Sequence, residues 1–120
     1  MKYFFDTYAI IEIIRESEAY KPYLDEEMTT SLLNVGELYY SLIRECDKKT
    51  ADYWATKLEF CCLDFDVQVI MEAMDFRFKS KPKKFSFIGC VGYVMAKRNE
   101  LVFLTGDKEF EDMPNVEYVK

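Results

Sequence analysis

The residues in this sequence that could do chemistry are three acidic side chains. Asp6 follows the aromatic segment KYFF, and Asp107 follows the apolar segment LVFLT and a glycine. Glu37 is the only charged residue between Glu27 and Arg44. Carboxylate oxygens are the ligands that hard divalent cations such as Mg²⁺ and Mn²⁺ prefer. If the fold brings these three acids together, they predict a metal site.

The chain contains no histidine, which excludes several familiar kinds of catalytic site. Ser–His–Asp and Cys–His catalysis both need an imidazole base. The four cysteines lack the paired C-x-x-C spacing of a structural zinc site. We expect them to be buried, reduced thiols, although their number alone would also allow two disulfides. Chemistry must therefore come from carboxylates, lysine, hydroxyl groups or a metal ion held by oxygen ligands.

The composition is that of a globular, acidic chain. Its 120 residues are half hydrophobic and 17% aromatic, which fits one domain, residues 1–120, with a substantial core. The net charge of −6 argues against a broad phosphate-binding surface but not against a local one. No uncharged stretch approaches the roughly 20 residues needed to cross a bilayer, and Asp6 interrupts any secretory signal core. We therefore expect a soluble, cytoplasmic protein without membrane attachment.

The elements that must position the acids alternate between short apolar strands and amphipathic helices. We expect strands at residues 2–5, 27–31, 61–65, 101–105 and 116–119. We expect helices at residues 7–20, 32–46, 48–60, 67–80 and 86–96, the first capped by Asp6 or Thr7 and the fourth by Asp66. Such alternation predicts crossover connections and a three-layer α/β/α domain with a mostly parallel central sheet of about five short strands.

Ligands of open parallel sheets bind beyond the carboxyl ends of the strands. Asp6 ends the first strand and Asp107 follows the fourth, so we expect both at this edge. Glu37 lies on the helix over residues 32–46 and is expected to be half-buried or at the mouth of a pocket, near a cation or a hydrogen-bond donor. Each acid alone has a simpler explanation, as a helix cap, a turn residue or a surface position. Together they predict a site for Mg²⁺ or Mn²⁺.

Three segments that carry these acids resemble the PIN domain, a small metal-dependent nuclease fold that includes the VapC toxins of toxin–antitoxin systems. FFDTYAII resembles the opening strand of the family, TSLLNVGELYYSLI its glutamate-bearing helix, and LTGDKEFEDMPNVEYV its closing segment. The resemblance covers essentially the whole chain. It implies that Asp6, Glu37 and Asp107 are catalytic ligands of Mg²⁺ or Mn²⁺ in an RNA-cleaving site, with Thr7 and Thr105 as supporting hydroxyls.

One position departs from the family pattern. The segment SFIGCVGYVM is similar to a helix start where the family usually has a fourth acid, and Gly89 occupies that position here. Losing one of four carboxylates is expected to weaken ion binding and to impair the ribonuclease. Three acids can still hold one Mg²⁺, because that ion retains several waters. Gly92, on the same helix, is expected to permit close packing instead.

The resemblance also implies partners, namely an RNA substrate, a small antitoxin protein that covers the acidic pocket, and a second copy of the chain in a homodimer. A basic segment with Lys81, Lys83 and Lys84 runs up to Gly89. It is expected either to hold RNA phosphates beside the pocket or to be a solvated loop. The alternative function is a catalytically inactive PIN-like module that binds RNA or a protein partner without cutting.

Overall fold

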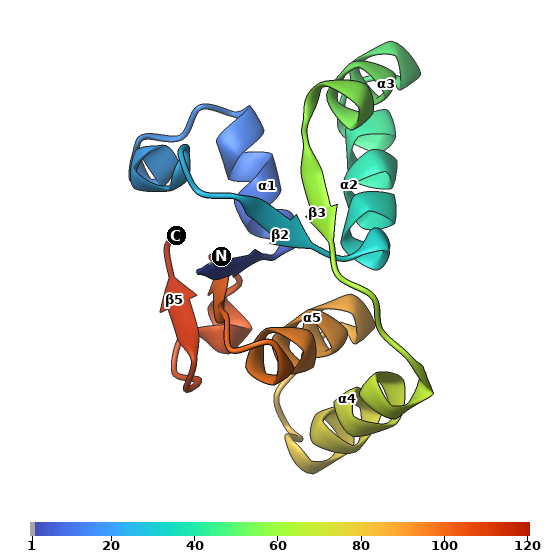
Figure 1. The fold of residues 1–120 in the computed structure, drawn as a ribbon, viewed down its shortest axis with the longest axis vertical. Helices are drawn as coiled ribbons and strands as arrows, with labels where there is room; N and C mark the ends of the chain where they lie inside the picture. The colour runs from blue at the N-terminus through green and yellow to red at the C-terminus, as the bar shows by residue number, and fades with distance from the viewer. Residues whose placement is uncertain (1) are drawn as a thin grey trace.

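A five-stranded parallel sheet forms the middle layer of the protein, as seen in a computed structural model that describes residues 2–120 (Figure 1). The strands run in the order β3-β2-β1-β4-β5, and each neighbouring pair is parallel. Helical crossovers join the first four strands, so helices cover both faces of the sheet. The strands are β1 (Tyr3–Phe5), β2 (Met28–Thr30), β3 (Phe60–Cys62), β4 (Val102–Thr105) and β5 (Val116–Tyr118). The predicted three-layer α/β/α class is confirmed.

The helices divide between the two sides of the sheet (Figure 1). One side carries α1 (Thr7–Ile14), α2 (Leu32–Glu45) and α3 (Lys48–Lys57), and the other carries α4 (Val67–Lys79) and α5 (Phe87–Arg98). Short 3₁₀ helices follow α1 and β4, namely η1 (Glu18–Tyr23) and η2 (Lys108–Phe110). The cap predictions for Asp6 and Asp66 are confirmed, because both side chains accept backbone hydrogen bonds at the helix starts.

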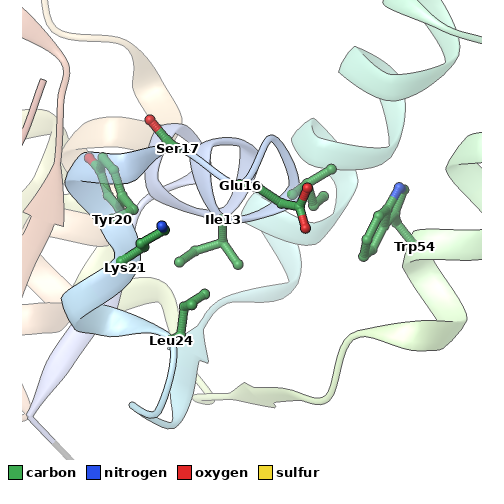
Figure 2. A pocket seen from close by; sticks show the side chains of 8 residues that line it. Ile13, Glu16, Ser17, Tyr20, Lys21, Leu24 and Trp54 are labelled. Carbon is green, nitrogen blue, oxygen red and sulfur yellow. The ribbon is translucent and has the colours of Figure 1, made fainter.

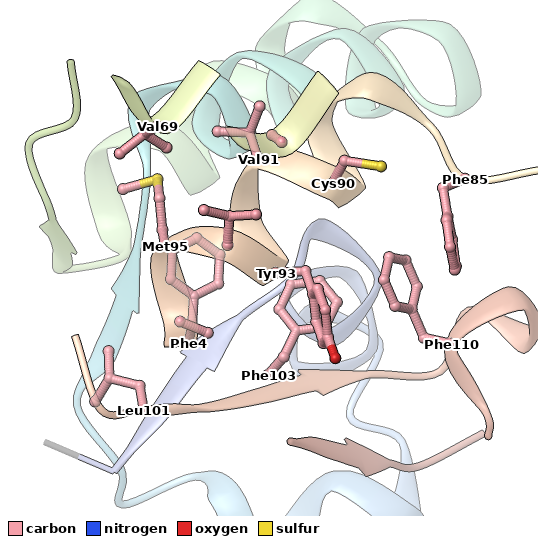
Figure 3. Close-up of a cluster of buried hydrophobic side chains, with 13 residues drawn as sticks. Phe4, Val69, Phe85, Cys90, Val91, Tyr93, Met95, Leu101, Phe103 and Phe110 are labelled. Carbon is pink, nitrogen blue, oxygen red and sulfur yellow. The ribbon is translucent and has the colours of Figure 1, made fainter. Parts of the chain in front are cut away.

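Alternation of side chains along the central strands divides the core in two. Phe4 and Phe103 belong to the cluster on the α5 side, which Figure 3 shows with Tyr93 and Phe110. A β-carbon added at Gly92 would lie 2.9 Å from the Phe4 ring and 3.1 Å from the Phe103 ring. The absence of a side chain therefore lets α5 approach the sheet closely, as predicted.

The helix predicted over residues 7–20 is wrong in length, because α1 ends at Ile14. Glu16 adopts a positive φ of 58°, which takes the chain out of the right-handed helix. The Glu16 N–H donates to the Ile13 carbonyl and the Ser17 N–H donates to the Glu12 carbonyl, the two bonds of a Schellman motif. This motif usually uses glycine, so its glutamate gave no sign of a helix end in the sequence.

The thiol prediction is confirmed in part. All four cysteines are free, but Cys46 and Cys62 are exposed and Cys61 is half-buried, so burial was wrong for these three. Cys61 and Cys62 lie on the edge strand β3, where one face receives less cover than in the centre of the sheet. Across residues 2–120, the helices are all too short or too polar to cross a membrane.

Candidate active site

One pocket of about 660 Å³, at the carboxyl ends of β1 and β4, is lined by all three predicted acids. Asp6 directly follows β1, and Asp107 lies two residues beyond β4. These strands pair in parallel, and the Asp6 N–H donates to the Leu104 carbonyl oxygen at 3.0 Å. Glu37 reaches the same pocket from the middle of α2 and is half-buried. The structure therefore places the three acids at the predicted edge of the sheet.

Asp6 is the most deeply buried of the three acids, with 7% of its surface exposed. Its Oδ2 accepts a hydrogen bond from Thr105 Oγ1 at 2.6 Å, and its Oδ1 accepts one from the Thr7 N–H at 2.9 Å. Burial raises the pKa of Asp6 to about 7, the charges of Glu37 and Asp107 raise it too, and the two hydrogen bonds oppose the increase. A cation bound nearby would favour the ionised form.

Thr105 links the two acids that follow neighbouring strands. Its hydroxyl donates to Asp6 and accepts a hydrogen bond from the Asp107 N–H at 3.0 Å. Asp107 in turn caps η2, because its Oδ1 accepts the Glu109 N–H at 3.0 Å. Phe110, at the end of η2, is fully buried and stacks on the Phe85 ring of the core (Figure 3). The aromatic core therefore anchors the turn that carries Asp107.

Asn34 is a site residue that the sequence analysis missed. It is fully buried on α2, one helical turn before Glu37. Its Nδ2 donates to Thr7 Oγ1 at 3.0 Å and lies 3.5 Å from Asp6 Oδ1, and its Oδ1 accepts from Ser31 Oγ at 2.7 Å. The sequence does show an asparagine three residues before Glu37, which places both residues on one face of the helix. It does not reveal that this face of α2 packs against the start of α1.

Gly89 lies in the first turn of α5, next to the pocket. Its N–H donates to Ser86 Oγ at 2.9 Å, and Ser86 lines the pocket with the three acids. A β-carbon added at Gly89 would lie 2.8 Å from Ser86 Oγ and 3.3 Å from the Phe110 ring. A side chain at this position would therefore begin between the pocket rim and the aromatic core, and the Ser86 hydroxyl would have to shift.

The predicted basic segment lines a second hollow of about 600 Å³, which shares Ser86 with the acidic pocket. Lys81, Lys83 and Lys84 all line it. Lys83 has a structural contact as well, because its Nζ donates to the Glu109 carbonyl at 2.9 Å. The Lys84 N–H donates to the Glu109 carboxylate at 2.8 Å. The basic segment is thus tied to the turn that follows Asp107.

A third hollow, of about 420 Å³, lies at the other end of α1 (Figure 2). Ile13 and Leu24 line it, with Trp54 of α3 on the far side. Its charged lining residues are Glu16 and Lys21. One carboxylate beside one ammonium group does not provide the set of oxygen ligands that a hard cation needs, so this hollow does not compete with the acidic pocket.

The donor set of the acidic pocket fits a hard divalent cation. It offers carboxylate and hydroxyl oxygens and no sulfur or imidazole ligand. Over residues 2–120, no three acidic or thiol side chains converge closely enough to surround a metal ion by themselves. Mg²⁺ needs only one or two carboxylates and retains several waters. The open pocket therefore fits an ion that these acids hold partly directly and partly through water.

Residues 3–116 match the family model of the PIN domain. No curated protein matches the sequence. VapC20 of Mycobacterium tuberculosis, a sarcin–ricin loop cleaving toxin, has a similar structure, with a TM-score of 0.82, 17% identity and coverage of 99% of this chain and 100% of that chain.

Two DNA-bound complexes also match. VapBC2 of Rickettsia felis, bound to a DNA fragment of its promoter, gives a TM-score of 0.72 at 18% identity and covers 100% of both chains. VapBC of Salmonella typhimurium gives a TM-score of 0.72 at 21% identity, with coverage of 98% of this chain and 96% of that chain. At such identities the structural matches show the fold alone.

Proposed function

This chain belongs to the PIN domain family, and we propose that it is a Mg²⁺- or Mn²⁺-dependent endoribonuclease of the VapC type, the toxin of a toxin–antitoxin pair. The observation that carries the proposal is the single pocket lined by Asp6, Glu37 and Asp107. Its ligands suit a hard cation, and its position at the carboxyl ends of parallel strands is the usual place for a ligand in such a fold.

Hydrolysis of an RNA phosphodiester requires water to attack phosphorus while the bond to the leaving ribose oxygen breaks. Asp6, Glu37 and Asp107 would hold the divalent cation, which when bound activates water and offsets the negative charge of the phosphate. Both oxygens of Asp6 and one oxygen of Asp107 already accept hydrogen bonds from the protein. These hydrogen bonds hold the two carboxylates in place for the ion. The attacking water would release its proton to solvent, and the leaving ribose oxygen would take up a proton from solvent.

The hydroxyl and amide groups around Asp6 have a positioning role in this proposal. Thr105 and the Thr7 N–H fix the Asp6 carboxylate in one orientation, and Asn34 holds the Thr7 hydroxyl. A carboxylate that is already held in one orientation loses less conformational entropy when it binds an ion. Thr7 and Thr105 thus support the metal ligands by holding the Asp6 carboxylate in place.

Gly89 attenuates the activity in this proposal. A carboxylate there would stand in the first turn of α5, where the partial positive charge of the helix N-terminus favours an acid. Without it, three acids hold the ion and one water-positioning group is missing. The same departure favours a second candidate function, an inactive PIN-like module that binds RNA or a protein without cutting.

RNA, an antitoxin protein and a second copy of the chain are the proposed partners. Lys81, Lys83 and Lys84 would hold RNA phosphates in the hollow beside Ser86. The structural relatives include toxin–antitoxin complexes, which supports an antitoxin protein as the physiological inhibitor. We further propose that the chain acts in the cytoplasm as a homodimer.

The test is RNA cleavage by the purified chain, compared with Asp6→Asn and with Asp112→Asn as an exposed control. Cleavage should require Mn²⁺ or Mg²⁺, should fall by about 100-fold or more in Asp6→Asn, and should persist in Asp112→Asn. A module that only binds would show the same RNA affinity in all three proteins and no cleavage, and that result would replace the nuclease by the second candidate.

A further inference from the structure

The α2 wall of the acidic pocket carries an aromatic ring and an arginine that the carboxylate chemistry does not use. Tyr40 and Arg44 both line the pocket with Glu37. The three residues follow one another at spacings of three and four along α2, which places them on one face of the helix. The ring and the guanidinium group form a pair, with Arg44 Cζ 5.4 Å from the centroid of the Tyr40 ring.

The fold does not account for Tyr40. Its side chain is 63% exposed, whereas most aromatic rings of this chain lie in one of the two core clusters. Arg44 pairs with Glu45 at 3.9 Å, but both side chains are more than half exposed. Such a pair is weak, so the guanidinium group is available to another anion. An exposed aromatic ring and a weakly paired guanidinium group therefore lie together at the rim of a pocket suited to phosphodiester hydrolysis.

We propose that Tyr40 and Arg44 position the nucleotide beside the scissile bond, with its base stacked on Tyr40 and its phosphate paired with Arg44. The inference rests on the proposed function and specifies the substrate as single-stranded RNA with an unpaired base at this position. Aromatic side chains bind single strands by stacking, and the planar guanidinium suits phosphate oxygens. Bases inside a duplex have both faces covered by their neighbours, so they cannot stack on Tyr40.

A protein partner is the other macromolecule that could cover this helix. Leu32 and Ile43 of α2 are also exposed, at 69% and 40%. Neither residue lines the acidic pocket, whereas Tyr40 and Arg44 do. The pairing of a ring with a cation beside the acids favours RNA for Tyr40 and Arg44, and a protein on this face is an outcome that the test distinguishes.

The binding test uses a fluorescein-labelled single-stranded RNA of about 12 nucleotides and the matching duplex, with Asp6→Asn present in each protein to prevent cleavage. Adding Tyr40→Ala should weaken single-strand binding by roughly tenfold, and Tyr40→Phe should restore it. Arg44→Gln should weaken binding more than Arg44→Lys does. Tyr53→Ala, another exposed tyrosine, and Lys49→Gln, another exposed cation, should leave the affinity unchanged.

A second set of probes identifies the base that stacks. Single abasic nucleotides placed in turn along the RNA should weaken binding at one position when Tyr40 is present, and should have no further effect there in Tyr40→Ala. In Mn²⁺-dependent cleavage, Tyr40→Ala should raise KM more than it lowers kcat, while Mn²⁺ affinity and the melting temperature stay the same.

The inference is overturned if Tyr40→Ala binds single strands as tightly as Tyr53→Ala, if the duplex binds better, or if Tyr40→Ala loses only the binding of an antitoxin protein. If RNA is cleaved and these variants change nothing, the inference alone fails. If no form of the chain binds or cleaves RNA, the proposed function fails as well.

Discussion

Asp6 combines burial with two acidic neighbours, so its charge is unfavourable for folding in the absence of a cation. Its pKa rises from 3.8 to about 7. A group whose pKa is raised in the folded state stabilises the fold at low pH and loses that contribution as the pH rises through the folded value. The metal-free protein should therefore become less stable between about pH 4 and pH 8. This instability follows from burying the Asp6 carboxylate beside two other acids.

Asp6→Asn should remove most of this pH dependence. At pH 8 and without divalent cations, the variant should be more stable than the unmodified chain by an amount on the order of 4 kcal/mol, and the difference should vanish near pH 4. Urea denaturation at a series of pH values measures it. The exposed control Asp112→Asn should follow the unmodified chain, and parallel curves for all three proteins would contradict the burial argument.

Gly89 is the residue whose change should raise activity. Gly89→Asp should increase Mn²⁺-dependent RNA cleavage by on the order of tenfold, because it supplies a further carboxylate beside Ser86. Gly89→Asn has nearly the same shape without the charge, so it separates the carboxylate from packing effects. Both variants must displace the Ser86 hydroxyl, so their melting temperatures should be compared as well. Equal cleavage by all three proteins would show that Gly89 does not stand at the place of a ligand.

The sequence allowed the acids to be predicted but not the group that orients them. Asp6 and Asp107 are each preceded by a short apolar strand, and parallel strands end at one edge, so their proximity followed from general rules. Asn34 could not be identified in this way. Its role depends on the packing of α2 against the start of α1, which is a contact between segments about 28 residues apart.

Ser86, at the start of α5, lies on the rim of the acidic pocket, so its position depends on how closely α5 packs against the sheet. Gly92→Ala should destabilise the fold by about 1–3 kcal/mol, because its β-carbon would press against Phe4 and Phe103. Gly36→Ala is the matched control on α2, where a β-carbon would meet no atom within 4 Å. That change should stabilise the helix by about 1 kcal/mol. Thermal unfolding measures both effects, and a neutral Gly92→Ala would contradict the close-packing argument.

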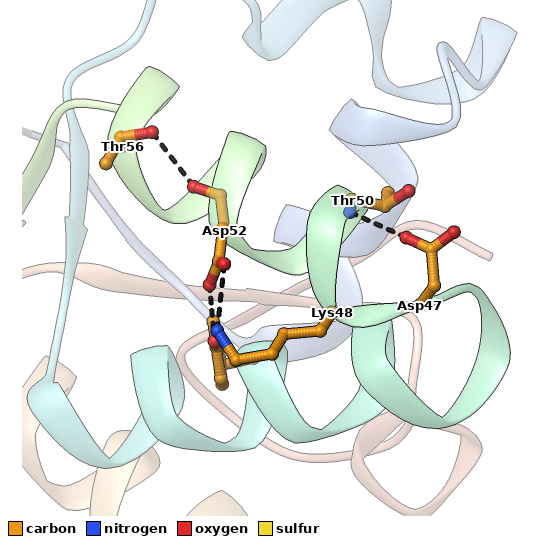
Figure 4. A network of polar contacts seen from close by, with 6 residues as sticks. Asp47, Lys48, Thr50, Asp52 and Thr56 are labelled. Atoms are coloured by element: carbon orange, nitrogen blue, oxygen red, sulfur yellow. Dashed lines mark hydrogen bonds and ion pairs between the residues drawn. The ribbon is translucent and has the colours of Figure 1, made fainter.

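Contacts between α2 and α3 hold the helix that carries Glu37. The Tyr39 hydroxyl donates to Asp52, and Lys48 Nζ donates to the other carboxylate oxygen of Asp52 at 2.9 Å. Figure 4 shows Lys48 and Asp52 on successive turns of α3. The Tyr39 hydroxyl and then the Lys48 ammonium group lower the pKa of Asp52, which keeps this carboxylate charged and bonded. These contacts fix α2, the helix that carries Glu37 and Tyr40, against α3.

The basic segment should act through charge alone. Lys81→Gln and Lys84→Gln should each weaken binding of single-stranded RNA and reduce the dependence of log affinity on log salt by about 0.7. Lys57→Gln, an exposed lysine of α3, serves as the control. Lys83 is a poor choice for this experiment, because its ammonium group also holds the Glu109 carbonyl. An unchanged salt slope in both variants would make the segment a solvated loop.

Element boundaries were predicted well where a cap or a turn residue marks them. Asp66 and Ser80 bound α4 as expected. The end of α1 was missed because Glu16 takes the conformation that glycine usually takes in this motif. The order β3-β2-β1-β4-β5 was not predicted either, since strand order depends on which crossover passes over which face.

At the scale of the whole molecule, an acidic chain can still bind RNA if its charges are arranged locally. The net charge is −6, yet the acidic pocket and the basic hollow meet at Ser86. A divalent cation in the pocket would remove much of the repulsion between the three acids and a phosphodiester. The cation should therefore strengthen RNA binding before any bond is cut, which connects the proposed metal site to the proposed substrate.

The central claim is that Asp6, Glu37 and Asp107 form one site for a divalent cation. Isothermal titration of Mn²⁺ into the unmodified chain and into Asp6→Asn at pH 8 tests it most directly, because this pH lies above the raised pKa of Asp6, about 7, so the unmodified chain carries the Asp6 charge that the variant lacks. We predict that the unmodified chain binds Mn²⁺ at this site and that Asp6→Asn loses the binding. Equal Mn²⁺ affinity in the two proteins would contradict the claim.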